Sequence, residues 1–452
     1  MNEGVVPFDR AKIQAILDRT GFDLNDLSIR ETNRLVQHIE EDLGVQFVRM
    51  EFGIPNLPYD PVCAQTAIEA ESDHKVSAQY PPFDGIPELK TEASRFLKNF
   101  LNLDIPPECC VPTVGAMQAG FIAQAIAGNR LPGRDTILYL EPSFPVSRRQ
   151  TRFLGLGLES VELSEFRGAD LVREVERRFT RGNIGGMLYS SPNNPSWITL
   201  KEKELKGLGE LCTRFDVLAI EDLAYFCMDF RQDYGIPGQP PYQPSIAHHT
   251  DHYFVLISSS KIFSFPGARI GIAVISPALM KMRAPSLKPR FSTENVGHAF
   301  VHGGIYCTTA GVPQSSQWGL VGLLRKANAG ELNFVENTRE YGRRAKELKK
   351  IFAKHGFKLV YDNDMGEALA DGFYFTFAYP GFNGRQLLIE MLHYGISAIT
   401  LESTGSRRTE GLRACVSFVD PSQFPLVEER LRIFQADHPV TKPESNRIGG
   451  LA

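Results

Sequence analysis

Short apolar runs alternate with helical patterns through the middle of this 452-residue chain. Each run ends in polar or turn residues, and the runs are TILYL (136–140), IGGMLYS (184–190), VLAIED (217–222) and YFVLISS (253–259). The segments between them, such as residues 200–215, have the spacing of amphipathic helices. Strands buried on both faces of a parallel sheet have this composition, because helices cover both faces. The sequence therefore predicts an α/β fold.

A second and smaller α+β layer is predicted for the C-terminal part of the chain. A helical pattern begins near residue 316, and its length predicts a helix that bridges two domains. Strand and helix patterns alternate after it, and two amphipathic helices are predicted within residues 8–45. We expect a large domain and a small domain made of both ends of the chain, with boundaries at 58–325 and at 1–57 plus 326–452.

Charge and cysteine content exclude several classes of protein. The net charge of -4 gives no attraction for polyanions, so neither nucleic acid nor a membrane is expected as a partner. No apolar stretch approaches the length of a membrane-spanning helix, and the N-terminus has no signal-peptide pattern. The seven cysteines contain no C-x-x-C pair, which favours a reduced, cytoplasmic protein. The histidine-rich loop at residues 248–252 is interpreted as a solvated loop, so no metal is expected.

Lys261 carries the clearest chemical signal. It follows an apolar strand in ISSSKIFSFPGARIG, among serines and eight positions before Arg269. The carboxyl end of a parallel strand borders the crevice in which α/β proteins bind ligands. Serines and an arginine are suited to a phosphate, and a nearby cation lowers the pKa of an amine. This neighbourhood indicates a carbonyl cofactor held by the lysine as a Schiff base.

Three other predicted strands also end in residues whose side chains could bind a ligand or take part in a reaction. Asp222 ends one strand and is followed by Tyr225, Asn194 follows a second strand, and Phe144 follows a third. Taken singly, the carboxylate and the amide could belong to turns and the aromatic rings to the core. Because the carboxyl ends of parallel strands meet at one edge, their convergence with Lys261 predicts a single functional site.

The chain resembles the class I/II pyridoxal-phosphate-dependent aminotransferases of fold type I, the aspartate aminotransferase superfamily. The resemblance extends from GIP near residue 53 to LRACVSF near residue 411. Its most specific motif, S-x-S-K followed by R-x-G, is matched by Ser258, Ser260, Lys261, Arg269 and Gly271. The resemblance implies the fold of the fold type I PLP-dependent transferases, with a mostly parallel seven-stranded sheet between helices in the large domain and a smaller α+β domain.

The resemblance also implies roles for individual residues around pyridoxal 5′-phosphate. Lys261 would hold the cofactor as a Schiff base and then move the proton of the substrate. Asp222 would pair with the pyridine nitrogen, and Tyr225 and Asn194 would bind the phenolic oxygen of the ring. Phe144 would stack on the ring face.

The phosphate site implied by the resemblance combines several stretches of the chain. A strand-to-helix turn in TVGAMQAG directs backbone N–H groups and the helix dipole at an anion. The residues expected there are Gly115, Ala116, Met117, Ser258 and Arg269. Tyr80 matches a tyrosine that reaches the phosphate in the neighbouring subunit, which implies a homodimer with shared active sites; the alternative is a tyrosine that anchors a proline-rich turn.

The substrate side of the site is expected to bind an α-carboxylate. Arg413 in GLRACVSF matches the arginine that grips this group, and Gly53 would let the backbone approach it. Asn194 would also face the substrate. The chain departs from the family at Trp197, where a glycine is usual, and an arginine for a substrate side chain cannot be placed. No preference for aspartate is therefore predicted.

These residues predict a PLP-dependent aminotransferase of amino acid metabolism. It would move an amino group from an L-amino acid to a 2-oxo acid by a ping-pong mechanism through the Lys261 Schiff base. One alternative is a fold type I lyase or synthase, because elimination and decarboxylation use the same cofactor residues. A second is a transcription regulator with a PLP-binding domain, but the roughly 45 residues before Gly53 are too few for a DNA-binding module.

Overall fold

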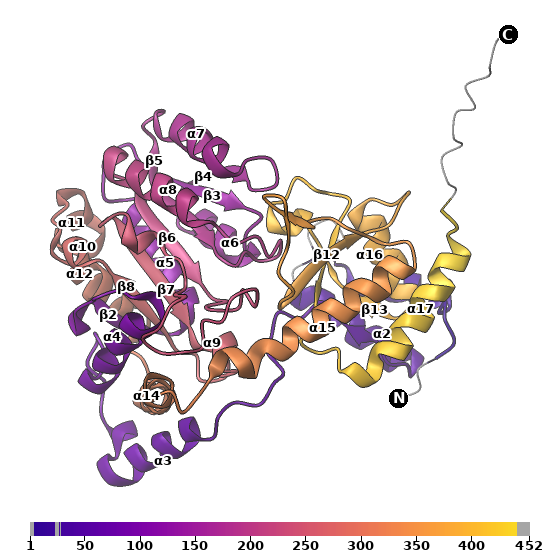
Figure 1. Cartoon of the computed structure of the whole chain (residues 1–452), viewed down its shortest axis with the longest axis horizontal. Helices are drawn as coiled ribbons and strands as arrows, with labels where there is room; N and C mark the ends of the chain where they lie inside the picture. Colours follow the sequence, from indigo (N-terminus) through magenta and orange to yellow (C-terminus); the bar gives the residue numbers. More distant parts are fainter. Residues whose placement is uncertain (1–3, 23–26, 28, 441–452) are drawn as a thin grey trace.

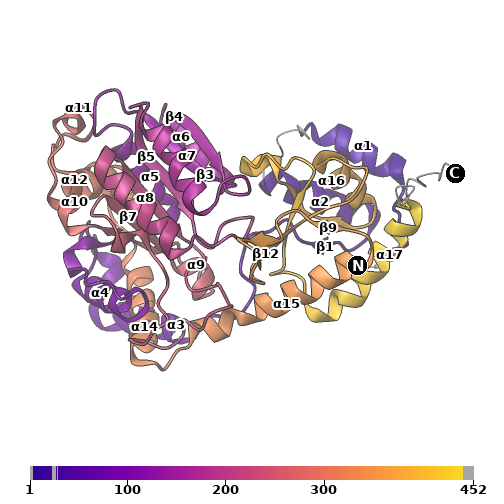
Figure 2. The same ribbon diagram turned by 45° about the horizontal axis from the view of Figure 1, so that its top comes forward.

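The computed structural model describes residues 4–22, 27 and 29–440 and consists of two lobes. The larger lobe contains the sheet predicted from the apolar runs, and the smaller lobe contains both ends of the described chain (Figure 1). The helix α15 (Phe334–Lys354) extends from one lobe to the other, as Figures 1 and 2 both show.

The larger lobe is built on a seven-stranded sheet with the order β2-β8-β7-β6-β5-β3-β4. The strands β3 to β7 are parallel to their neighbours in this group, whereas β8 is antiparallel to both β2 and β7. The predicted α/β class and the mostly parallel seven-stranded sheet are thus confirmed. The strands are β2 (Cys110–Thr113), β3 (Thr136–Glu141), β4 (Gly157–Glu162), β5 (Ile184–Ser190), β6 (Leu218–Leu223), β7 (Tyr253–Ser258) and β8 (Gly271–Ile275).

Helices cover both faces of this sheet, which explains why its central strands are largely apolar, whereas the edge strand β4 is only partly buried and contains two glutamates. In β3, Leu138 and Leu140 belong to one buried cluster, whereas Ile137 and Tyr139 belong to a second cluster on the other face. The first face packs against α4 (Pro87–Leu101), α7 (Gly168–Phe179), α8 (Glu202–Phe215) and α14 (Gln314–Ala329). The second packs against α5 (Gly115–Ala127), α10 (Pro277–Lys281), α11 (Lys288–Phe291), α12 (Val296–His298) and η5 (Ala299–Ile305).

The smaller lobe contains an antiparallel four-stranded sheet with the order β14-β15-β12-β9. Its strands are β9 (Lys358–Leu359), β12 (Tyr374–Ala378), β14 (Ile399–Thr400) and β15 (Leu412–Cys415). The N-terminal segment joins this lobe, because β1 (Val48–Arg49) pairs with β13 (Ile396–Ser397). The helices of the lobe besides α15 are α1 (Arg10–Thr20), α2 (Ile29–Leu43), α16 (Gly384–His393) and α17 (Phe424–Asp437).

The helical stretch predicted from residue 316 onward, too long for a typical helix, forms two helices. The first, α14, ends at Gly330, which has a left-handed φ of 77°. The second, α15, begins after Asn333, whose side chain accepts a hydrogen bond from the N–H of Glu336. A glycine in the left-handed region and an asparagine cap are the usual end and start of helices. Only the second helix bridges the lobes.

The domain boundaries at residues 57/58 and 325/326 stay a prediction. The two lobes have this general division, with α3 (Val62–His74) and α14 packed against each other in the larger one. Within the described ranges, none of the helices combines the length and the apolar composition that crossing a membrane requires.

Candidate active site

The predicted residues of the larger lobe meet at the carboxyl ends of β5, β6 and β7. The strand register places Ser190 beside Asp222, and Leu223 beside Ile257. The chain therefore brings the turn that contains Asn194, the end of β6 and the start of α9 (Ser259–Ile262) to one edge of the sheet. Lys261 lies in α9, a single turn of helix that follows β7 directly.

Lys261 and Asp222 influence each other electrostatically without forming an ion pair within 4 Å. Burial lowers the pKa of the Lys261 amine to about 8; Asp222 opposes this shift, and Arg269 adds to it. Burial likewise raises the pKa of Asp222 to about 6, against the effects of Lys261 and of a hydrogen bond from the N–H of Ala224. Burial thus shifts the pKa values of this amine and this carboxylate toward neutrality.

The start of α5 and the guanidinium of Arg269 form a compact cationic cradle. Gly115 has a left-handed φ of 68°, and a Cβ on it would lie 2.6 Å from Nη2 of Arg269. The N–H groups in the first turn of a helix have no acceptor within that helix. Gly271 permits this close approach, because a Cβ there would lie 3.0 Å from the backbone nitrogen of Ala116. Ser258 is buried at the end of the adjacent strand β7.

Arg413 lies on β15 of the smaller lobe and is fully buried. Its Nη2 donates to the carbonyl oxygen of Glu51 at 2.7 Å, and its Nη1 lies 3.5 Å from Oδ1 of Asn194. Its Nε has no hydrogen-bond partner, and no carboxylate lies within 4 Å of the guanidinium, among the residues that the structure describes. A buried cation without a counter-ion is costly, so this geometry is suited to an external carboxylate.

Gly53 lies next to Arg413, as the sequence predicted. A Cβ on Gly53 would lie 3.9 Å from Nη1 of Arg413 and only 2.5 Å from the hydroxyl oxygen of Tyr374. Any larger residue would therefore displace one of these two side chains. Asn194 is buried beside them in the turn after β5.

Tyr225 is buried in the same crevice. The hydroxyl of Tyr225 donates to the hydroxyl of Tyr374 at 2.8 Å, and its ring centroid lies 6.0 Å from Nζ of Lys261. Burial is the main cause that raises the pKa of this phenol far above its usual value, so it stays protonated. It can therefore act as a hydrogen-bond donor at any physiological pH.

Two predicted residues lie apart from these contacts. Phe144 caps the start of α6 (Pro145–Phe153) at the end of β3, and its ring makes no aromatic contact with another described residue. Tyr80 is 86% exposed, which leaves its side chain available to a neighbouring molecule. The roles of both residues stay predictions.

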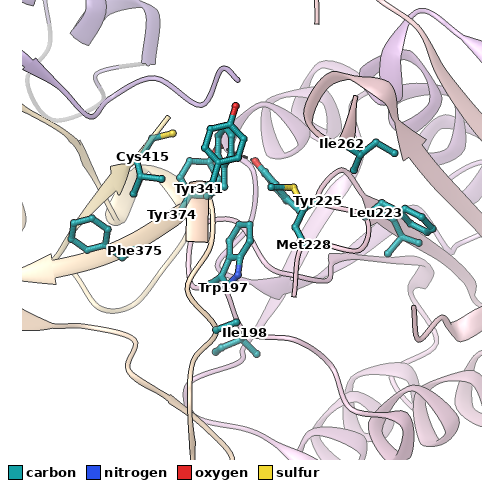
Figure 3. Close-up of a cluster of buried hydrophobic side chains, with 14 of the residues drawn as sticks. Trp197, Ile198, Leu223, Tyr225, Met228, Ile262, Tyr341, Tyr374, Phe375 and Cys415 are labelled. Atoms are coloured by element: carbon teal, nitrogen blue, oxygen red, sulfur yellow. Dashed lines mark hydrogen bonds between the residues drawn. The ribbon is translucent and has the colours of Figure 1, made fainter. Parts of the chain in front are cut away.

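Sequence patterns do not single out Tyr374, and they assign no role to Trp197. Both side chains belong to a buried cluster with Tyr225 and Cys415 between the lobes (Figure 3). The indole of Trp197 packs edge-on against Tyr225, with ring centroids 5.2 Å apart, and against Tyr374 at 6.1 Å. It fills the space above Gly372, where a Cβ would lie 2.0 Å from the indole.

Comparison with known proteins was made for sequence and structure. A family model described as aminotransferase class I and II matches residues 49–366. A probable aspartate aminotransferase from Methanocaldococcus jannaschii is 28% identical over 202 residues, which are 45% of this chain and 50% of that protein. The aspartate/prephenate aminotransferase of Thermus thermophilus is 25% identical over 307 residues, or 68% of this chain and 71% of that protein.

The three-dimensional comparison agrees with the sequence comparison. A structure of an aspartate aminotransferase from Thermus thermophilus with maleate has a TM-score of 0.71 and covers 90% of this chain and 96% of that chain. The sequence identity in this alignment is 21%, so the likeness establishes the fold alone.

Proposed function

This chain belongs to the aminotransferase class I and II family, whose members typically depend on pyridoxal phosphate, and we propose that it transfers an amino group from an L-amino acid to a 2-oxo acid. The observation that carries this proposal is the pair formed by Lys261 and Asp222, an amine with its pKa lowered to about 8 and a carboxylate with its pKa raised to about 6. An amine with this lowered pKa has a much larger free-base fraction near neutral pH than an ordinary lysine, and it is therefore suited to react with a carbonyl group and to carry protons.

The cradle at Gly115 fits the phosphate of pyridoxal 5′-phosphate. A Cβ would fill the space between this turn and Arg269, and the residue there is a glycine. Backbone N–H groups of Ala116 and Met117, together with the guanidinium, supply donors for a dianion at the positive end of a helix. Ser258 would add a hydroxyl from the end of β7.

The side chains of Lys261 and Asp222 would hold the ring of the same cofactor between them. Nζ of Lys261 has no hydrogen-bond partner among the described residues, and the carboxylate of Asp222 is held by the N–H of Ala224 at 3.1 Å. An aldehyde would meet the amine, and a pyridine nitrogen would meet the carboxylate, which keeps that nitrogen protonated. Asn194 and Tyr225 would bind the ring oxygen, and Phe144 would cover one face.

Different residues of the chain would have different roles in the reaction. When bound, pyridoxal phosphate supplies a carbonyl group for the amine of the substrate and a ring that accepts electrons from the substrate Cα. Nζ of Lys261 would accept the proton from the substrate Cα and pass it on to the bound cofactor. Arg413 binds the α-carboxylate through the guanidinium edge that lacks a counter-ion and so orients the Cα–H bond. The buried wall of Trp197 and Tyr374 excludes water from this region.

A stoichiometric experiment tests the transfer. The purified holoprotein, mixed with an excess of a single L-amino acid, should release one equivalent of 2-oxo acid per active site and then stop. A second 2-oxo acid should restart the release. Continuous release of ammonia, carbon dioxide or a side-chain fragment without an acceptor would instead identify a lyase, the second candidate. Screening the common L-amino acids in this way identifies the donor.

We also propose that the protein is a homodimer in which Tyr80 of each protomer contacts the phosphate bound to its partner. The exposure of Tyr80, which is 86%, supports this proposal because it leaves the side chain accessible to a neighbouring protomer. Sedimentation equilibrium of the wild type measures the assembly. Tyr80→Phe should weaken cofactor binding without changing the mass of the assembly.

The compartment proposed is the cytoplasm. All seven cysteines of the chain are free thiols, and six of them are buried. A protein of an oxidising compartment would more often pair such thiols. Fractionation of the source cells, with antibody detection of the chain, tests this location.

A further inference from the structure

We propose that Tyr374 is a positioning residue of this active site, whose hydroxyl holds Tyr225 and whose ring holds Arg413. It would thereby fix the position of Tyr225, on the cofactor side of the site, relative to Arg413, on the carboxylate side. This inference rests on the proposed function, because it assigns Tyr374 to the same site. Its basis is a set of contacts that no other described side chain of the smaller lobe makes together.

The first contact is a hydrogen bond between the lobes. The hydroxyl of Tyr225, just after β6 of the larger lobe, donates to the hydroxyl of Tyr374 on β12 of the smaller lobe at 2.8 Å. The two rings meet nearly at right angles, with an interplanar angle of 77° and centroids 5.5 Å apart. Both side chains are buried, so water does not compete for this bond. Figure 3 shows the pair between β12 and the larger lobe.

The second contact is with Arg413. In the antiparallel pair β12–β15, Thr376 lies opposite Arg413 and Tyr374 lies opposite Cys415, so Tyr374 and Arg413 share one face of the sheet. The guanidinium carbon lies 4.5 Å from the centroid of the Tyr374 ring, within the range of a cation–π interaction. The ring supports one face of a guanidinium whose Nη2 is already fixed by the carbonyl of Glu51.

The third contact is with the turn at Gly53. The hydroxyl of Tyr374 lies 2.5 Å from the point where a Cβ of Gly53 would be, so it touches the backbone of this turn. One phenol therefore contacts Tyr225, which is expected to bind the cofactor oxygen, as well as Arg413 and Gly53, which are expected at the substrate carboxylate. A side chain with only a structural role in the lobe would not need to reach all three.

Packing against Trp197 restricts the positions that the side chain of Tyr374 can take. The edge of its indole packs against the rings of both tyrosines at interplanar angles of 63° and 72°. Trp197 has a left-handed φ of 63° and is 1% exposed, so packing holds it in a conformation that disfavours non-glycine residues. The tryptophan where the family usually has a glycine thus forms a wall that keeps the tyrosine pair in place.

The hydroxyls of Tyr225 and Tyr374 can exchange the roles of donor and acceptor. A tyrosine hydroxyl has one proton to donate and can accept from others. Tyr374 can therefore donate to Tyr225 whenever Tyr225 donates to a bound ligand. A donor that itself accepts a hydrogen bond is a stronger donor. Removal of the Tyr374 hydroxyl should then weaken the bond from Tyr225 to the cofactor, although Tyr225 is unchanged.

Two substitutions separate the two functions of the side chain. Tyr374→Phe removes the hydroxyl and keeps the ring under Arg413. We expect pyridoxal phosphate to bind the apoprotein about 3- to 10-fold more weakly, and the KM for the amino acid to change less than about 2-fold. The pH midpoint of the cofactor absorbance should move to higher pH. Tyr374→Leu also removes the ring, and we expect an additional rise of KM by about 5-fold or more.

A matched control lies at the end of the same strand. The hydroxyl of Tyr379 donates to the carbonyl oxygen of His438 at 2.6 Å, within the smaller lobe. Tyr379→Phe therefore removes a comparable hydrogen bond outside the site and should leave both the cofactor dissociation constant and the absorbance midpoint unchanged. Thermal unfolding of each apoprotein measures how far the loss of a hydroxyl affects the fold.

The outcomes distinguish this inference from the proposed function. If Tyr374→Phe binds the cofactor like the wild type and has the same absorbance midpoint, Tyr374 does not position Tyr225. If Tyr374→Phe changes the cofactor dissociation constant and the absorbance midpoint, but Tyr379→Phe changes them equally, the effect is structural and the inference fails. If the wild type binds pyridoxal phosphate but transfers no amino group, the proposed function fails, while the cofactor measurements on Tyr374 still decide the inference.

Discussion

Substitution of Gly115 by alanine gives a quantitative test of the cationic cradle. The new Cβ would lie 2.6 Å from Nη2 and 3.2 Å from Cζ of Arg269. Contacts of this length do not occur, so the guanidinium must move away from the start of α5. Gly115 also has a φ of 68°, at which an alanine is strained.

The two effects of Gly115→Ala appear in different measurements. The backbone strain, about 1 to 2 kcal/mol for an L-residue in the left-handed region, is present with and without the cofactor. It lowers the free energy of unfolding but cancels in the binding equilibrium. Displacement of Arg269 removes a charge-assisted hydrogen bond to the phosphate, about 1.5 to 3 kcal/mol. The dissociation constant of pyridoxal phosphate should then rise by about 10- to 100-fold.

Gly133 provides the matched control. It has a similar φ of 73°, but no heavy atom lies within 4 Å of its Cβ position. Gly133→Ala should therefore lose the same 1 to 2 kcal/mol or so of unfolding free energy and bind the cofactor normally. Urea denaturation of the apoproteins and titration with pyridoxal phosphate, followed by absorbance, give both quantities. Equal cofactor affinity in the two variants would refute the assignment of the cradle to the phosphate.

Three further predictions concern other residues of the active site. The rate at which the apoprotein captures pyridoxal phosphate should rise with pH through about 8 as Lys261 loses its proton, and a stopped-flow midpoint near 10 would mean that the amine is not desolvated. Arg413→Ala should raise the KM for amino acids by about 100-fold and change the dissociation constant of the cofactor little. Loss of cofactor binding would contradict the assignment of Arg413 to the substrate carboxylate. Trp197→Gly should relieve strain but lose the packing of a buried indole, for a net loss of about 3 kcal/mol in urea denaturation of the apoprotein; an unchanged midpoint would show that the indole adds nothing to stability.

Much of the larger lobe could be predicted because its signals are local. Each buried parallel strand is a continuous apolar run, and the polar residues that end these runs, such as Asp222 and Asn194, mark the edge of the sheet that holds the crevice. The break between α14 and α15 was missed, since the helical pattern continues on both sides of Gly330 and a single glycine is tolerated within helices. The left-handed φ of Gly330 and the side-chain cap at Asn333 separate the two helices.

Tyr374 could not be predicted, and the reason lies in the composition of β12. The run from Phe373 to Phe377 contains four aromatic residues, and every residue in it is buried. Alternation in a strand identifies the face of a side chain only when one face is polar, and here both faces are covered. The register with β15, which sets Tyr374 opposite Cys415 and Thr376 opposite Arg413, is what turns Tyr374 toward the crevice. That register joins segments about 40 residues apart in the chain, so the local pattern of β12 alone does not reveal that Tyr374 lies on the same face as Arg413.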